Sequence, residues 1–150
     1  MRAESGADHD LDRGVWGANP SARQVNDAAA LNLSIAVARR RRVIDASDSR
    51  RGVAEALGKS EQSVSAMLER QALLGLKVGR EWRIPAWQMA PGLSAGILPG
   101  LRELAMAHLG GVVSLSEWVQ RPNPDLDGST PREALLRGAI AEVVAAARTE

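Results

Sequence analysis

Few residues in this sequence have the types and spacing that catalysis requires. Gly92-Leu93-Ser94-Ala95-Gly96 matches the string of a nucleophile elbow, in which a serine attacks a carbonyl after a histidine has taken its proton. That chemistry needs a strand before the serine, a helix after it, and a histidine held by an acid. Neither element is predicted around Ser94, and the two histidines, His9 and His108, fall in a predicted tail and at a predicted helix end. We therefore expect a protein that is not an enzyme.

Phosphate-loop and metal-binding patterns are also incomplete. Gly52 and Gly58-Lys59-Ser60 are separated by five residues where a phosphate loop has four, and the residues between them are good helix formers. Cysteine is absent, and two distant histidines cannot supply a zinc site. No acidic residues have the spacing of a calcium loop. We expect neither a metal nor a cofactor.

Charge is distributed unevenly along the chain, although the net charge is only +1. Residues 1–12 carry one Arg against four acids, a net charge of −3. Residues 13–90 carry thirteen Lys or Arg against seven acids, which is +6, and residues 91–150 carry five against seven, which is −2. Because local patches rather than totals steer association, the middle region is the candidate for binding a polyanion.

Two short helices separated by a tight turn are predicted inside this basic region. Ser49 caps a helix over 50–57 that ends at Gly58, and Ser60 caps a second helix over 61 to about 70. Ala54, Gly58 and Val64 occupy positions 5, 9 and 15 of a helix-turn-helix. Alanine there allows close helix packing, glycine takes the left-handed turn, and valine fills the crossing. Lys59 departs from the apolar residue that usually follows the glycine.

A β-hairpin is predicted directly after these helices. Leu76-Lys77-Val78 and Trp82-Arg83-Ile84 alternate in polarity around 79–81. This alternation predicts Leu76, Val78, Trp82 and Ile84 on the inner face, with Lys77 opposite Arg83 on the outer face. Two like charges in that position are unfavourable unless they are solvated or face an anion such as phosphate. The segment 76–88 resembles the wing of excisionase-like and MerR-like winged helices.

DNA binding is the function that this region favours. The second helix of a helix-turn-helix inserts its N-terminal part into the major groove, so Gln62 and Ser65 are expected to face base edges, with Gln62 able to bind adenine. Glu61 is ambiguous, because it could accept a hydrogen bond from cytosine or repel phosphate. Cations around the helices would bind phosphate. The predicted DNA-contacting residues are Arg50, Arg51, Lys59, Ser60, Glu61, Gln62, Ser65, Lys77, Arg80 and Arg83.

The remaining chain is predicted to be mostly helical. A helix capped by Asn26 or Asp27 should run to the four arginines 39–42, although Leu31, Leu33, Ile35 and Val37 alternate as in a strand. Further helices are expected over 101–108, 114–120 and 131–148, the last with Leu136, Ile140, Val143, Val144 and Ala147 on one stripe. The expected organisation is a flexible tail over 1–20, a DNA-binding domain over 21–90, a linker or ordered loop over 91–100 and a helical domain over 101–150.

The loop from Trp118 to Pro131 has the composition of a preshaped recognition surface. Its three prolines and one glycine limit the conformations that the backbone can adopt, so little entropy remains to be lost on binding. Thr130-Pro131-Arg132-Glu133 predicts a capping box with proline at the first helical position. The alternative is a structural connection between two core helices, with Trp118 as an ordinary core residue.

These residues resemble the C-terminal pattern of the Xre–MbcA–ParS toxin-binding family of bacterial antitoxins. The resemblance covers roughly the last third of the chain, in the order Trp118, Pro122-Asn123-Pro124, Leu126, Gly128 and Thr130-Pro131. It implies a partner that is a RES-domain toxin acting on NAD, with a DNA-binding helix-turn-helix that represses the shared operon as a homodimer on operator DNA. The resemblance implies toxin contact through Trp118, Arg121, Pro122, Asn123, Pro124, Leu126, Gly128, Thr130 and Pro131.

The expected fold is mainly α, a winged helix-turn-helix with one small β-hairpin followed by a small helical toxin-binding domain. The expected location is the cytoplasm, because no apolar run approaches the length of a membrane span and residues 1–12 are too polar for a secretory signal. The rival function is a free-standing winged-helix transcription regulator whose C-terminal domain dimerises or senses a ligand.

Overall fold

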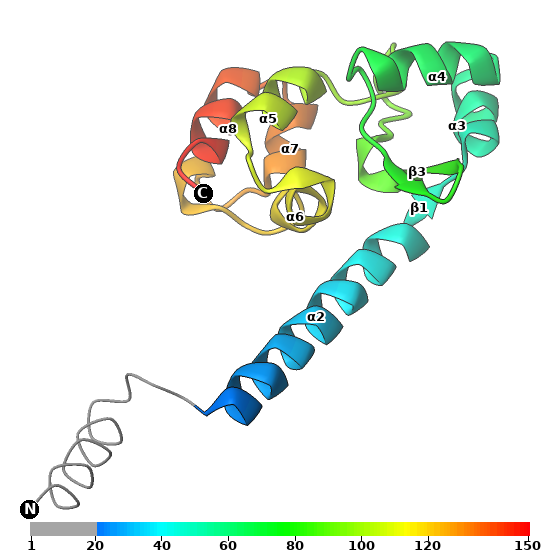
Figure 1. Ribbon diagram of the computed structural model, residues 1–150. Coiled ribbons are helices and arrows are strands. Elements are labelled where there is room, and N and C mark those ends of the chain that lie inside the picture. The colour runs from blue at the N-terminus through cyan, green and yellow to red at the C-terminus, as the bar shows by residue number, and fades with distance from the viewer. Residues whose placement is uncertain (1–20) are drawn as a thin grey trace, which may run out of the picture. The chain divides into compact units, whose positions relative to one another are not determined.

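A computed structural model describes residues 21–150 and shows a mainly helical chain with a small antiparallel sheet of three strands (Figure 1). The expected tail, including His9, lies outside the described residues. By contacts the chain divides into two units, Met1–Ala38 and Arg39–Glu150. The elements are α2 Ala22–Asp45, β1 Ser47–Asp48, α3 Arg50–Leu57, α4 Glu61–Glu69, β2 Leu76–Val78, β3 Glu81–Pro85, α5 Leu101–Ala107, α6 Gly111–Trp118, α7 Pro131–Leu136 and α8 Ile140–Ala147, with 3-10 turns η1 Ala86–Gln88 and η2 Pro124–Leu126.

Helix α2 begins earlier than the sequence suggested. Ser21 rather than Asn26 or Asp27 is the capping residue, because its Oγ accepts a hydrogen bond from the Gln24 N–H at 3.2 Å while Gln24 Oε1 accepts from the Ser21 N–H at 2.8 Å. This reciprocal pair satisfies two of the amide groups that a helix start leaves free. The alternation of apolar residues over 31–37 therefore lies within a helix.

Helices α3 and α4 begin and end where local sequence predicts. The Ser49 side chain accepts from the Gly52 N–H, and the Ser60 side chain accepts from the Ser63 N–H. Gly58 ends α3 with φ of 65°, a left-handed conformation that glycine adopts without steric cost. Val53, Ala54, Val64, Met67, Leu68, Leu73 and Ile84 form a shared buried cluster.

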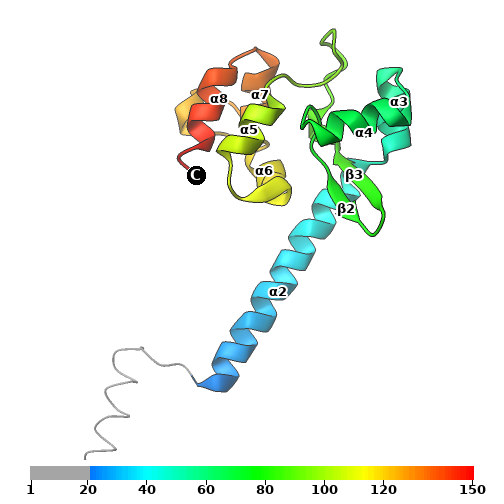
Figure 2. The same cartoon turned by 45° about the horizontal axis from the view of Figure 1, so that its top comes forward.

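The sheet has strand order β1-β3-β2, and the edge strand β1 was not predicted. β2 and β3 form a hairpin (Figure 2) in which Val78 pairs with Glu81, so that only Gly79 and Arg80 form the turn. The expectation of Lys77 opposite Arg83 is wrong: Lys77 pairs with Trp82, and Leu76 pairs with Arg83. A turn one residue shorter than expected moves every side chain of β2 to the other face.

Segment 91–100 is an ordered loop that packs against both cores. Ile97 pairs with Met89 in an isolated bridge, and the Leu98 N–H donates to the Gln88 carbonyl at 2.9 Å. Ile97 packs against the α3–α4 cluster, whereas Leu98 is buried in a second cluster that contains most of the C-terminal core. The loop therefore joins the two cores of the Arg39–Glu150 unit.

The last predicted helix is two helices. Gly138, with φ of 84°, separates α7 from α8. The Ala139 N–H donates to the Ala134 carbonyl and the Gly138 N–H to the Leu135 carbonyl, each at 2.9 Å, which is the hydrogen-bond pattern that ends a helix at a left-handed glycine. The expected single stripe is consequently divided: Leu136 is exposed, whereas Val143 and Ala147 are buried.

Candidate functional site

The first turn of α4 presents an exposed polar surface. Ser60, Glu61, Gln62 and Ser63 are all exposed, and the Ser60 hydroxyl donates to Ser63 Oγ at 3.0 Å. Gln62 therefore lies where the sequence predicted it. Ser63 was not among the predicted contacts, although the burial of residues 64, 67 and 68 places 62, 63 and 66 on the outer face of a 3.6-residue helix.

Ser65 does not face outward as expected. It is half-buried, and its Oγ accepts a hydrogen bond from Arg50 Nη1 at 2.9 Å while lying 3.1 Å from the Glu61 carbonyl, to which it donates. Arg50 is half-buried as well. These contacts connect the start of α3 to α4, so both residues position the exposed end of α4 rather than present their own side chains.

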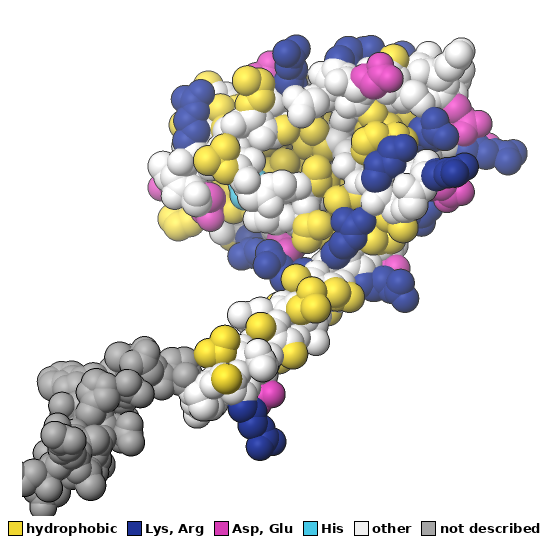
Figure 3. All heavy atoms as spheres, viewed as in Figure 1, with side chains coloured by type: hydrophobic (Ala, Val, Ile, Leu, Met, Phe, Trp, Pro, Cys, Tyr) yellow, Lys and Arg dark blue, Asp and Glu magenta, His cyan; other side chains and the backbone are white. Residues whose placement is uncertain are grey.

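The cations near this surface differ in whether their side chains are paired with an acid. Arg51 and Lys59 are exposed, and Arg51 lies 3.4 Å from Glu55 in a pair that is open to solvent. Such a pair contributes little to stability, so Arg51 remains able to change partners. Figure 3 shows Lys and Arg side chains gathered over α3, α4 and the hairpin, with fewer acidic side chains among them.

The hairpin exposes its cations unequally. Lys77 Nζ lies 5.0 Å from the centre of the Trp82 ring, a cation–π contact, and 3.4 Å from the Arg80 carbonyl. Arg80 occupies the exposed turn, and Arg83 is half-buried. Of the three predicted phosphate contacts in the hairpin, Lys77 and Arg80 are therefore the more accessible.

The C-terminal loop is held by its own backbone around Asn123. The Asn123 N–H donates to the Ser129 carbonyl, and its carbonyl accepts from the N–H groups of Leu126 and Gly128, each at 3.0 Å. Asn123 Oδ1 also accepts from the Asp125 N–H at 2.8 Å. Because Asn123 is also buried, this residue shapes the loop from inside.

The predicted capping box that follows the loop is confirmed. Thr130 Oγ1 accepts from the Glu133 N–H at 3.1 Å, Glu133 Oε2 accepts from the Thr130 N–H at 3.3 Å, and Pro131 occupies the first turn of α7. Both contacts satisfy amide groups at the helix start. The end of the loop is thus attached rigidly to α7.

Burial divides the predicted partner-contacting residues into two groups. Trp118 and Leu126 are 6% and 5% exposed and belong to the C-terminal core, which leaves little of either side chain for direct contact with a partner. Pro131 is buried and Thr130 half-buried. The exposed members of the predicted set are Arg121, Pro122, Pro124 and Gly128.

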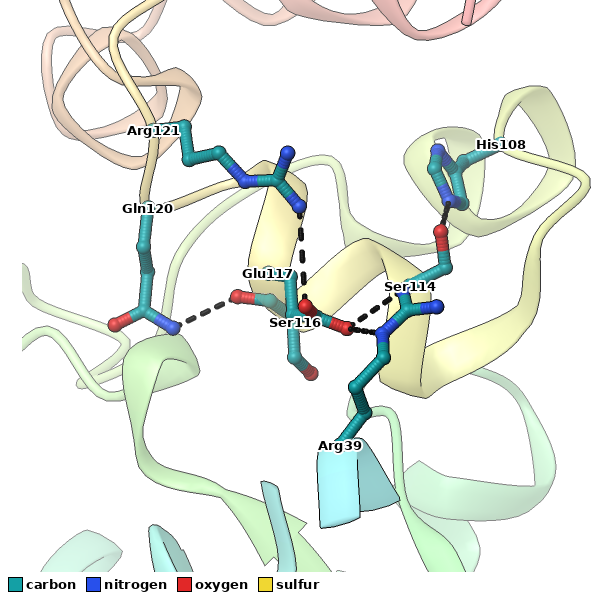
Figure 4. Close-up of polar contacts among 7 residues, drawn as sticks. All are labelled: Arg39, His108, Ser114, Ser116, Glu117, Gln120 and Arg121. Atoms are coloured by element: carbon teal, nitrogen blue, oxygen red, sulfur yellow. Dashed lines mark hydrogen bonds and ion pairs between the residues drawn. The ribbon is translucent and has the colours of Figure 1, made fainter. Parts of the chain in front are cut away.

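Glu117 of α6 connects this loop with the end of α2 (Figure 4). Its Oε1 accepts from Arg39 Nε at 2.8 Å, and its Oε2 lies 3.8 Å from Arg121 Nη2. A hollow of about 300 Å³ opens beside this pair and is lined partly by Arg42 and Trp87. Arg121 is thus oriented by an acid, yet most of its side chain is open to solvent.

His108 ends α5 and packs against Trp118. The two ring centres are 5.9 Å apart, and His108 Nε2 is 3.1 Å from Ser114 Oγ. Nδ1 is buried and has no hydrogen-bond partner among the described residues. Burial lowers the pKa of His108 below its ordinary value of 6.5, and the negative charge of Glu150 opposes this effect.

Ser94 lies outside any strand–turn–helix arrangement among residues 21–150. Ser94 is exposed in the packed loop, and no helix of residues 21–150 begins directly after it. Among these residues no three His, Cys, Asp or Glu side chains lie close enough together to hold a metal ion. Within the described part of the chain, no helix is both long and apolar enough to cross a bilayer.

Comparisons with known proteins identify no relative of this chain. No family model, curated protein or solved structure matches it.

Proposed function

We propose that this chain is an antitoxin that binds and blocks a RES-domain, NAD-consuming toxin and represses its own operon through DNA binding. The observation that carries the DNA-binding half is the pair α3–α4. Its left-handed Gly58, its two serine caps and its exposed first turn of α4 have the features of a helix-turn-helix, and the following hairpin would be the wing.

In this proposal α4 enters the major groove by its N-terminal end. Gln62 would bind a base edge, with Ser63 beside it, while Arg51, Lys59, Lys77 and Arg80 would bind phosphate. The Arg50–Ser65 hydrogen bond supports the proposal indirectly. It fixes the angle between the two helices and leaves the exposed side chains of α4 free to bind DNA. Repression of an operon would place two copies on a palindromic operator.

The toxin-binding half of the proposal depends on the resemblance of the loop and on its rigidity. Because Asn123, Leu126 and the Thr130 capping box determine the loop's shape from within the chain, binding would cost little ordering entropy. The surface offered to the toxin would consist of Arg121, Pro122, Pro124 and Gly128. Trp118 would hold this surface in place by packing in the C-terminal core.

DNA binding is tested by titrating the protein with its own upstream sequence at several salt concentrations. We expect affinity to fall steeply with salt, and Arg80→Ala to lower the slope of log K against log salt by about 0.9 for the lost phosphate contact. Gln62→Ala should reduce the preference for the operator over unrelated DNA. Arg102→Ala, which removes an exposed cation on α5, is the matched control and should leave both unchanged. A salt-independent affinity would reject the DNA-binding half.

Toxin binding is tested by co-expressing the chain with a RES-domain toxin from the same genome and measuring NAD and co-purification. We expect the wild-type chain to preserve NAD and to purify with the toxin, and Arg121→Glu to weaken both effects. Arg102→Glu makes the same charge change on α5 and should not. Depleted NAD and no co-purification with the wild-type chain would reject the toxin-binding half.

A second candidate function is favoured by the burial of Trp118, Asn123 and Leu126. Their side chains stabilise the chain's own core, which is also what a purely structural loop requires. In that case the protein would be a free-standing transcription regulator. It would bind operator DNA with the same salt dependence but would neither bind nor silence a RES-domain toxin.

A further inference from the structure

The helical segment 22–38 exposes apolar side chains that water does not favour. Val25, Leu31, Leu33, Ile35 and Val37 are between 49% and 67% exposed, and the other residues of the segment are exposed as well. Only Arg23 and Asp27 carry charge within it. A helix with so little charge and with apolar residues on most of its sides is typical of one that is covered by another protein surface.

One face of this segment is suited to close helix packing. Val25, Ala28, Asn32 and Ile35 recur at spacings of three and four residues, and Ala29 and Ala36 lie beside them, so these positions share a face. The alanines permit a close approach of a second helix. At 100° per residue Arg23, Asp27 and Ser34 lie on the opposite side.

We propose that this face is covered by the same face of a second copy of the chain, with the two helices antiparallel. The face is self-complementary because it holds no charge that would be repelled by its own copy. Asn32 adds a side chain with both donors and acceptors, and a single such polar residue within an apolar seam favours a defined register. Leu31 and Leu33, which are 62% and 67% exposed, flank the face and widen the apolar contact.

Charge selects the antiparallel orientation. Four consecutive arginines, Arg39 to Arg42, immediately follow the segment. A parallel pair would bring both arginine clusters to one end, where Arg39 of each copy is paired with Glu117 and the other three cations are not consumed by that acid. At helix separations of about 8–10 Å, which is about one Debye length, their repulsion is only partly screened. An antiparallel pair centred on residue 30, the midpoint of the segment, separates the two clusters and places Val25 opposite Ile35.

Solution mass tests whether the segment pairs. In buffer without DNA or toxin, light scattering should give the wild-type chain about twice the 16.0 kDa of one copy. Ile35→Glu should reduce the mass to that of one copy with helix content retained by circular dichroism. Ser34→Glu introduces the same charge on the opposite side and should remain dimeric. A wild-type monomer at tens of micromolar, or a dimer unaffected by Ile35→Glu, overturns the proposal.

Disulfide trapping tests the orientation, and the chain has no cysteine to interfere. Mixing Val25→Cys protein with Ile35→Cys protein under oxidation should yield a crosslinked heterodimer, whereas either variant alone should not crosslink. In the antiparallel register two copies of residue 25 are separated by ten residue positions, or about 15 Å, well beyond the roughly 7 Å that a disulfide spans between Cα atoms. Efficient self-crosslinking of Val25→Cys shows a parallel pair and overturns the proposal. Both tests are independent of the proposed function.

Discussion

Gln88 provides a direct test of what holds the β2–β3 hairpin in place. It is fully buried, and its side chain makes three hydrogen bonds. Gln88 Oε1 accepts from the Leu74 N–H at 2.6 Å, and Nε2 donates to the carbonyls of Leu74 at 2.7 Å and Pro85 at 3.1 Å. One amide side chain thus satisfies the backbone at both ends of the hairpin, which a buried segment requires.

Replacing Gln88 by Leu keeps a similar volume and removes all three hydrogen bonds. Each buried polar group left without a partner costs about 1–3 kcal/mol, which gives about 3–9 kcal/mol for three groups. Because two of the three are carbonyls, which are less costly to leave under-satisfied, we expect Gln88→Leu to lower the free energy of unfolding by about 3–6 kcal/mol. The Leu74 N–H should contribute most, because a carbonyl has a second lone pair with which to find another partner. A loss of this size is a large part of the total stability of a small protein.

Urea denaturation followed by tryptophan fluorescence measures the change, since Trp87 and Trp118 lie in the adjoining core. Gln120→Leu is the matched control: Gln120 is exposed, and its Nε2 makes only one hydrogen bond, to the Ser116 carbonyl. We expect the control to change stability by less than about 1 kcal/mol. If Gln88→Leu also costs less than that, Gln88 does not hold the hairpin as argued.

Three further changes should have measurable effects on stability. Gly138→Ala should lower the free energy of unfolding by about 1–2 kcal/mol, because alanine is strained at a φ of 84°. Gly92→Ala is the control in the same denaturation assay and should be nearly neutral, because the added methyl group meets no other atom. Thr130→Ala should cost about 1 kcal/mol by removing the cap of α7, and an unchanged urea midpoint would contradict the capping role. Because burial lowers the pKa of His108, the unfolded chain takes up its proton first as the pH falls. The contribution of neutral His108 to the free energy of unfolding should therefore be complete above pH 6.5 and should fall below it. His108→Gln should make the urea midpoint depend less on pH below 6.5.

Local sequence was sufficient for the elements whose ends depend on neighbouring residues. Ser49, Gly58 and Ser60 set the limits of α3 and α4, and Thr130 with Glu133 sets the start of α7. In each case a side chain or a glycine satisfies backbone groups within a few positions, so the information is contained in a short stretch of sequence. The exposed position of Gln62 follows from the same helix limits.

Tertiary structure decided the features that depend on distant partners. The strand β1 exists only because β3 pairs with it, and a turn one residue shorter than expected reversed the face on which Lys77 lies. Likewise, Ser65 is turned inward by Arg50, fifteen positions away.

The same division holds for the C-terminal loop. Its prolines and its capping box are visible in the sequence, but the burial of Trp118 and Leu126 is not. An aromatic or leucine side chain gains free energy by leaving water in its own core or in an interface, and composition does not distinguish the two. Only the packing of α5, α6, α7 and α8 around these residues decides that they belong to the core.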